Sequence, residues 1–196
     1  MLFGTDEIIL IGGAAIKLSS DPSRKIHDID ATLYPKKLYG LDNQQIEELG
    51  FKPLKEGDKL ISLIDKKTGI EIEVSAKLCQ MLNRALGIKS FNEENPTVLG
   101  LDLSEVIHDS KIVKVGDIKI RVPSGLDQIL MKYNLWLFRG EGKTENQKDA
   151  EDIKKLVAFY YKDIKNLLTE EKEQIQQKCK AKNVNEFQKD MELICG

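Results

Sequence analysis

Two aspartates spaced two residues apart, Asp28 and Asp30, are the residues of this chain best suited to catalysis. They lie in a stretch that alternates apolar and polar residues, as a β-strand does, and strand residues i and i+2 point to the same face. Two carboxylates side by side suit a divalent cation. Upstream, Gly12 and Gly13 follow an apolar run and open a short helical stretch, where backbone amides suit a phosphate. These features together predict a site for a metal and a phosphate, as in nucleotide chemistry.

A second acidic strand face offers a third carboxylate. In residues 69–75, apolar residues alternate with Glu71, Glu73 and Ser75, which repeats the pattern around the aspartates. Two strands that each present carboxylates on one face could share a metal. Both glutamates lie on the expected site face, so spacing alone leaves Glu73 and Glu71 as alternatives.

The elements that must position these residues alternate between strand and helix patterns as far as Pro123. Strands are expected at 7–11, 26–33, 59–65, 69–75, 111–115 and 118–122, the last four as two hairpins. Helices are expected at 14–19, 42–49 and 76–86. Residues 88–110 have no clear pattern, and 101–106 fit a strand or a turn. We predict an α/β domain over residues 1–123, built on a mixed twisted sheet.

Beyond Pro123 the apolar period becomes helical. Ser124 with Asp127 resembles a capping box, and the helix it begins should end at Gly140. A second helix should follow from Thr144, and residues 163–196 read as short, strongly charged helices. We predict a helical C-terminal region over residues 124–196 that completes the cleft.

Composition excludes several classes of protein. The chain has 196 residues and a formal net charge of −2, which gives no global attraction to nucleic acid or anionic membranes. We expect no signal peptide, because the first apolar run is short and acidic residues precede it, and no run reaches the roughly 18 to 20 apolar residues that a membrane span needs. Cys79, Cys179 and Cys195 have no metal-binding spacing and fit reduced thiols in a cytoplasmic protein. No Walker-type phosphate loop occurs.

The order and spacing of these residues carry a resemblance to a known family. Gly12-Gly13, then Arg24, then Asp28 and Asp30 resemble the nucleotidyltransferase superfamily of DNA polymerase beta and the minimal nucleotidyltransferases. Further along, a lysine-bearing helix followed by an arginine and a KDxxDI motif resembles the AbiE-type toxin nucleotidyltransferases. The residues that match there are Lys132, Arg139, Lys148, Asp149, Asp152 and Ile153. The resemblance covers roughly residues 7–157.

The resemblance implies a mechanism and a set of ligands. The family holds two Mg²⁺ ions, with Mn²⁺ as a substitute, on the two aspartates and a third acid, and it places that acid where Glu73 stands. The glycine turn would hold the triphosphate of a nucleoside triphosphate (NTP) through backbone amides. Lys132, Arg139 or Lys148 would neutralise its remaining charge. Asp149 and Asp152 would orient these basic residues or contact the nucleotide.

The expected activity is transfer of a nucleoside monophosphate (NMP) from an NTP to a hydroxyl group. The acceptor would be RNA such as tRNA, or a protein, and the resemblance adds a toxin or antitoxin partner. No membrane partner is expected, because no apolar run is long enough to span one. A protein of another class is the alternative, namely an inactive nucleotidyltransferase fold that binds a protein or RNA partner as an antitoxin or regulator. The glutamate at the third acidic position and the charged C-terminal region motivate that alternative.

Overall fold

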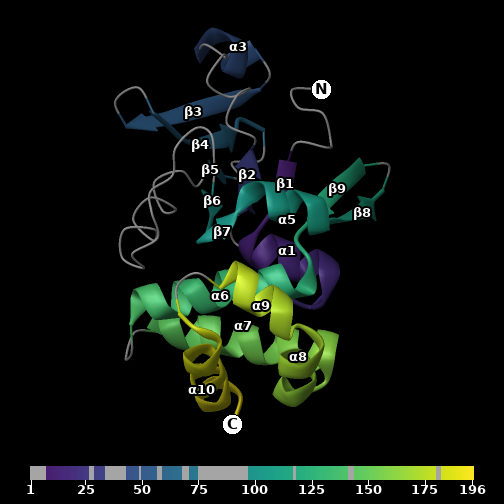
Figure 1. Cartoon of the computed structure of the whole chain (residues 1–196). Coiled ribbons are helices and arrows are strands. Elements are labelled where there is room, and N and C mark those ends of the chain that lie inside the picture. Colours follow the sequence, from purple (N-terminus) through teal and green to yellow (C-terminus); the bar gives the residue numbers. More distant parts are fainter. Residues whose placement is uncertain are drawn as a thin grey trace. The chain divides into compact units, whose positions relative to one another are not determined.

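The computed structural model describes residues 8–26, 29–33, 43–48, 50–56, 59–67, 71–74, 97–116, 118–140, 144–179 and 182–196. The chain divides into two compact units (Figure 1). Unit 1 comprises Met1–Lys77 and Asp109–Pro123, and unit 2 comprises Leu78–His108 and Ser124–Gly196. Among the helices in the described ranges, none is long and apolar enough to cross a membrane.

A mixed β-sheet forms the centre of unit 1, which confirms the predicted α/β class. Its strands are β1 (Ile8–Leu10), β2 (Ile29–Leu33), β3 (Phe51–Glu56), β4 (Lys59–Asp65), β5 (Glu71–Val74), β8 (Lys111–Val115) and β9 (Ile118–Val122). They lie in the order β3-β4-β5-β2-β1-β9-β8. The pairs β1·β9 and β2·β5 are parallel, and the other neighbours are antiparallel.

Helix α1 (Gly12–Ser19) contacts the centre of this sheet, at β2 and β9. Its buried residues are Ala14, Ala15 and Ile16, and the two alanines allow the helix axis to approach the strands closely. This packing fixes the start of α1 relative to β2, which is where the candidate site lies.

Both predicted hairpins of unit 1 are present, as β4·β5 and β8·β9. The expected helix at 42–49 corresponds to α3 (Asn43–Glu48), whereas the expected helix at 76–86 lies outside the described residues. The interpretation of 101–106 as a strand or a turn is wrong beyond Asp102, because α5 (Leu103–Asp109) begins there. The Asp102 carboxylate accepts hydrogen bonds from the amides of Ser104 and Glu105, at 2.8 and 3.3 Å, and so caps this helix.

Unit 2 is mainly helical. It contains the short strands β6 (Thr97–Val98) and β7 (Leu101–Asp102), most of α5, and the helices α6 (Gly125–Arg139), α7 (Thr144–Tyr161), α8 (Ile164–Glu170), α9 (Lys172–Lys178) and α10 (Val184–Cys195). As predicted, the Ser124 side chain caps α6 by accepting from the Asp127 amide at 3.1 Å, and the helix ends at Gly140. The segment around β6, β7 and α5 groups with these helices although it precedes Pro123. The boundary at residues 123 and 124 therefore stays a prediction.

Candidate active site

The first part of the candidate site is the junction between β1 and α1. Ile11 is extended, and Gly12 then turns with a φ of +61°, a conformation that favours glycine. A Cβ atom at Gly12 would collide with Oδ2 of Asp30 and would lie 3.1 Å from its Cγ. The backbone of Gly12 therefore lies directly against the Asp30 carboxylate. The absence of a side chain at this position is a requirement of both the turn and this contact.

The second glycine brings in the predicted arginine. A Cβ atom at Gly13 would lie 3.2 Å from Nε of Arg24, so the guanidinium group packs against the first turn of α1. Lys17 fixes the segment that carries this arginine, because its Nζ donates to the carbonyl oxygens of Pro22 at 3.0 Å and Arg24 at 2.6 Å. The N-terminal amides of a helix have no partners within the helix. An anion bound there would meet both those amides and a guanidinium group.

The strand register links Asp30 to the second acidic strand. In the parallel pair β2·β5, Asp30 is the direct partner of Glu73, and Glu73 in turn pairs with Ser62 of β4. Directly paired residues lie on the same face of a sheet. Glu71 lies two residues further from Asp30 along β5. The register thus favours Glu73 over Glu71 as the third acid, although the choice stays a prediction. Asp28 lies outside the described residues.

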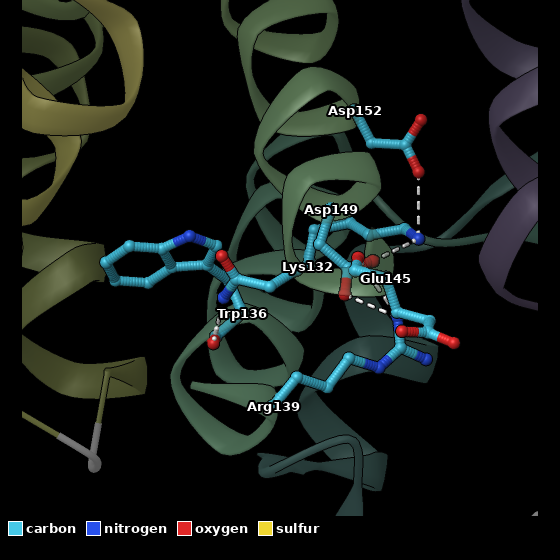
Figure 2. A network of polar contacts seen from close by, with 7 residues as sticks. Lys132, Trp136, Arg139, Glu145, Asp149 and Asp152 are labelled. Atoms are coloured by element: carbon cyan, nitrogen blue, oxygen red, sulfur yellow. Dashed lines mark hydrogen bonds and ion pairs between the residues drawn. The ribbon is translucent and has the colours of Figure 1, made fainter. Parts of the chain in front are cut away.

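A network of charged side chains joins α6 to α7 within unit 2 (Figure 2). Lys132 Nζ lies 2.9 Å from an oxygen of Asp149 and 2.9 Å from an oxygen of Asp152. The other Asp149 oxygen accepts from Arg139 Nη1 at 2.6 Å. The side chains of Lys132, Asp149 and Asp152 are 9%, 0% and 3% exposed. The formal charges of these four residues cancel.

The structure therefore unites four of the five charged residues that were predicted on these two helices. Lys148, the fifth, is exposed and is not part of the network. Asp149 and Asp152 contact these basic residues, whereas a role in orienting them for a substrate, and nucleotide binding by any of the five, stay predictions. Asn146 was not foreseen. Its Nδ2 donates to the Trp136 carbonyl oxygen at 2.7 Å and ties the end of α6 to α7, a tertiary contact that no local pattern signals.

The carboxylates of unit 1 supply the oxygen ligands that Mg²⁺ prefers. Among the described side chains, no three carboxylate, histidine or cysteine groups converge in a metal-binding arrangement. Of the three acids predicted to hold the metal, Asp30 alone has a described side chain, and Glu73 is described as backbone. The donor type and the Gly12–Asp30 contact fit a cation bound next to a phosphate.

Comparison with known proteins assigns no family to this chain. No protein-family model and no curated sequence matches it. Among solved structures, the chain is similar to an antigenic nucleotidyltransferase-like protein from Paracoccidioides brasiliensis, with 17% sequence identity and a TM-score of 0.45. The match covers 87% of this chain and 80% of the other. At this identity and TM-score the similarity by itself establishes neither a fold family nor an activity.

Proposed function

We propose that the chain is a Mg²⁺-dependent nucleotidyltransferase that transfers an NMP from an NTP to a hydroxyl group. The observation that carries the proposal is the contact between the Gly12 backbone and the Asp30 carboxylate. It joins the expected phosphate-binding turn to an expected metal ligand, from segments 18 residues apart in sequence. Arg24 beside Gly13 and the pairing of Asp30 with Glu73 add the two remaining parts in the same unit.

Each of these residues has a defined role in the proposal. The amides at the start of α1 and the Arg24 guanidinium bind the phosphates, and these donors are fixed before the substrate arrives. Such preorganisation aligns the α-phosphorus for in-line attack by the acceptor hydroxyl, with pyrophosphate as the leaving group.

The proposal assigns the metal to the three acids. Asp28, Asp30 and Glu73 would hold Mg²⁺, and the bound metal would lower the pKa of the acceptor hydroxyl and offset phosphate charge. Of the five charged residues predicted on α6 and α7, Lys148 is the one that is exposed and outside the network, so the proposal keeps it as the candidate for further phosphate contact. Lys132 and Arg139 already pair with buried aspartates and so would act mainly by shaping that unit.

Label transfer tests the proposal directly. The purified protein is incubated with each α-labelled NTP, Mg²⁺ and either bulk tRNA or a protein extract. We expect transfer with at least one NTP, and loss of transfer in Asp28→Ala and Asp30→Ala. Glu47→Gln removes an exposed carboxylate of the same unit and should transfer label like the wild type. No transfer by the wild type, or transfer that survives both aspartate substitutions, contradicts the proposal.

A growth assay with the wild type and Asp30→Ala addresses a toxin role. If the activity modifies an essential RNA or protein, expression of the wild type should arrest growth and Asp30→Ala should not. An inert scaffold that acts through a partner would give the same growth phenotype with and without Asp30.

A further inference from the structure

We propose that the β8–β9 hairpin is a docking surface for the sugar-phosphate backbone of an RNA acceptor. The surface is defined by Lys114, Lys119 and Arg121, and we call it the basic hairpin face. The inference rests on the proposed function, because it names the class of acceptor that the same sheet would serve.

The register places the three cations on one face of the hairpin. Lys114 is the direct partner of Lys119, and Ile112 is the direct partner of Arg121. Because side chains alternate along a strand, all four residues share one face. Lys114 and Lys119 are exposed. Arg121 is half-buried, its Nη1 donates to Ser110 Oγ at 3.0 Å, and its buried Nε has no hydrogen-bond partner in the described part of the chain.

The basic hairpin face belongs to the same side of the sheet as the candidate site. Arg121 pairs with Ile9 of β1, and Ile9 pairs with Thr32 of β2. Thr32 and Asp30 lie two residues apart on that strand and so share a face. Every member of this chain of pairings lies in unit 1.

The distance between the basic hairpin face and Asp30 decides which ligand the cations of the hairpin can bind. The strand order places β9 two strands from β2, and β8 three strands from it. At about 4.8 Å per strand, the hairpin cations lie at least about 10 Å and 14 Å from Asp30 across the sheet. Charges in water are screened over about 8 Å at physiological salt. At this separation the cations are largely screened from a metal site at Asp30, and their spread over two strands suits an extended polyanion.

The fold itself does not require this charge. Lys114 and Lys119 stand directly opposite each other, and like charges in that position destabilise a strand pair. Lysine on an edge strand protects against aggregation, which could account for Lys114 on β8. It does not account for Lys119 and Arg121, because β9 is paired on both sides. In the described part of the chain, no acidic side chain forms an ion pair with either lysine.

The chemistry of the surface favours a phosphate backbone over other partners. Residues 110–122 contain no aromatic side chain, so the hairpin offers no platform for base stacking. Contacts from lysine and arginine to phosphates fix the position of a nucleic-acid strand without reading its sequence. An acidic peptide added to the sheet would pair with the edge of β8, whereas two of the three cations lie on the inner strand. The basic hairpin face is therefore best suited to the backbone of RNA.

The test measures how the affinity for a labelled single-stranded oligouridine depends on salt, without Mg²⁺ or NTP. The variant is Lys114→Gln/Lys119→Gln. The control is Lys165→Gln/Lys189→Gln, which makes the same charge change at exposed lysines of α8 and α10. Each lost phosphate contact should reduce the slope of log K against log salt by about 0.7, so the hairpin variant should lose about 1.4. The control should keep the wild-type slope.

Several results would overturn the inference. They are the absence of RNA binding by the wild type, an unchanged slope in the hairpin variant, and an equal loss in the control. The hairpin variant should also melt at the same temperature as the wild type or higher, since it relieves a like-charge pair. If it fails to fold, the two single substitutions replace it. RNA binding with this pattern but no NMP transfer would refute the proposed activity alone, and transfer to a protein without RNA binding would refute the docking surface alone.

Discussion

Replacing Gly12 with alanine should damage the protein in two separable ways. The first is the backbone, because a φ of +61° costs an L-residue about 1–2 kcal/mol. The second is the collision of the new Cβ with Oδ2 of Asp30, which forces the carboxylate or the start of α1 to move. The free energy of unfolding should fall by the sum of both effects.

Gly116 provides a matched control for the first effect. Its φ is +60°, and a Cβ atom there has no atom within 4 Å. Gly116→Ala should therefore cost about 1–2 kcal/mol and no more. Gly12→Ala should cost clearly more, and the difference between the two variants isolates the contact with Asp30. Urea unfolding followed by circular dichroism gives both values, provided the slope with denaturant is unchanged.

A double-mutant cycle with Asp30→Ala assigns the excess to the carboxylate. In the absence of the carboxylate the alanine at position 12 should fit better, so the two substitutions should couple by about 0.5–3 kcal/mol. NMP transfer by Gly12→Ala should fall by about 100-fold or more, since a displacement of about 1 Å at a reacting centre has that effect. The reasoning is refuted if Gly12→Ala and Gly116→Ala are equally stable and Asp30→Ala shows no coupling.

Two further substitution sets test the helical unit. Lys132→Met removes a cation from two buried carboxylates, so it should lower the free energy of unfolding by about 3–5 kcal/mol. Lys148→Met, at an exposed position, should change the free energy of unfolding by less than about 0.5 kcal/mol. Urea unfolding measures both values. Burial, and after it a hydrogen bond to a carboxylate, raises the pKa of Tyr133 and of Tyr161 above the usual range. The protonated phenols therefore stabilise the fold fully below the unfolded pKa of about 10, and that contribution is lost as the pH rises above it. Alkaline unfolding should be less steep in Tyr133→Phe/Tyr161→Phe, and an identical pH dependence in variant and wild type would contradict this.

The sequence predicted the central part of the sheet because its signals there are local. Apolar runs, a glycine pair and alternating acids identified β1, β2 and β5, and the Ser124 cap identified the start of α6. Strand β3 was not predicted, because Pro53 and two lysines interrupt its apolar pattern. The strand order explains why the sheet tolerates this proline, since β3 lies at its edge.

The sequence predicted which residues the candidate site contains, whereas it did not predict which of these residues contact one another. Spacing placed Gly12 and Asp30 in adjacent elements, but the contact between them depends on how α1 packs on the sheet. Spacing also could not separate Glu73 from Glu71, and the pairing of β2 with β5 was needed to place Glu73 beside Asp30. The motif match identified Lys132, yet its burial results from the packing of α7 against α6.

Equilibrium binding of NTPs in the presence of Mg²⁺ tests most directly whether the start of α1 and the acidic strands form a nucleotide site. Each NTP is titrated into the wild type and into Asp30→Asn, with Glu47→Gln as the control. We predict that one or more NTPs bind the wild type and the control and raise their melting temperatures. An NTP at 100 times its Kd should add about 2.7 kcal/mol to the free energy of unfolding. Asp30→Asn should lose most of this effect. No binding to the wild type, or equal binding to Asp30→Asn, would contradict the central claim.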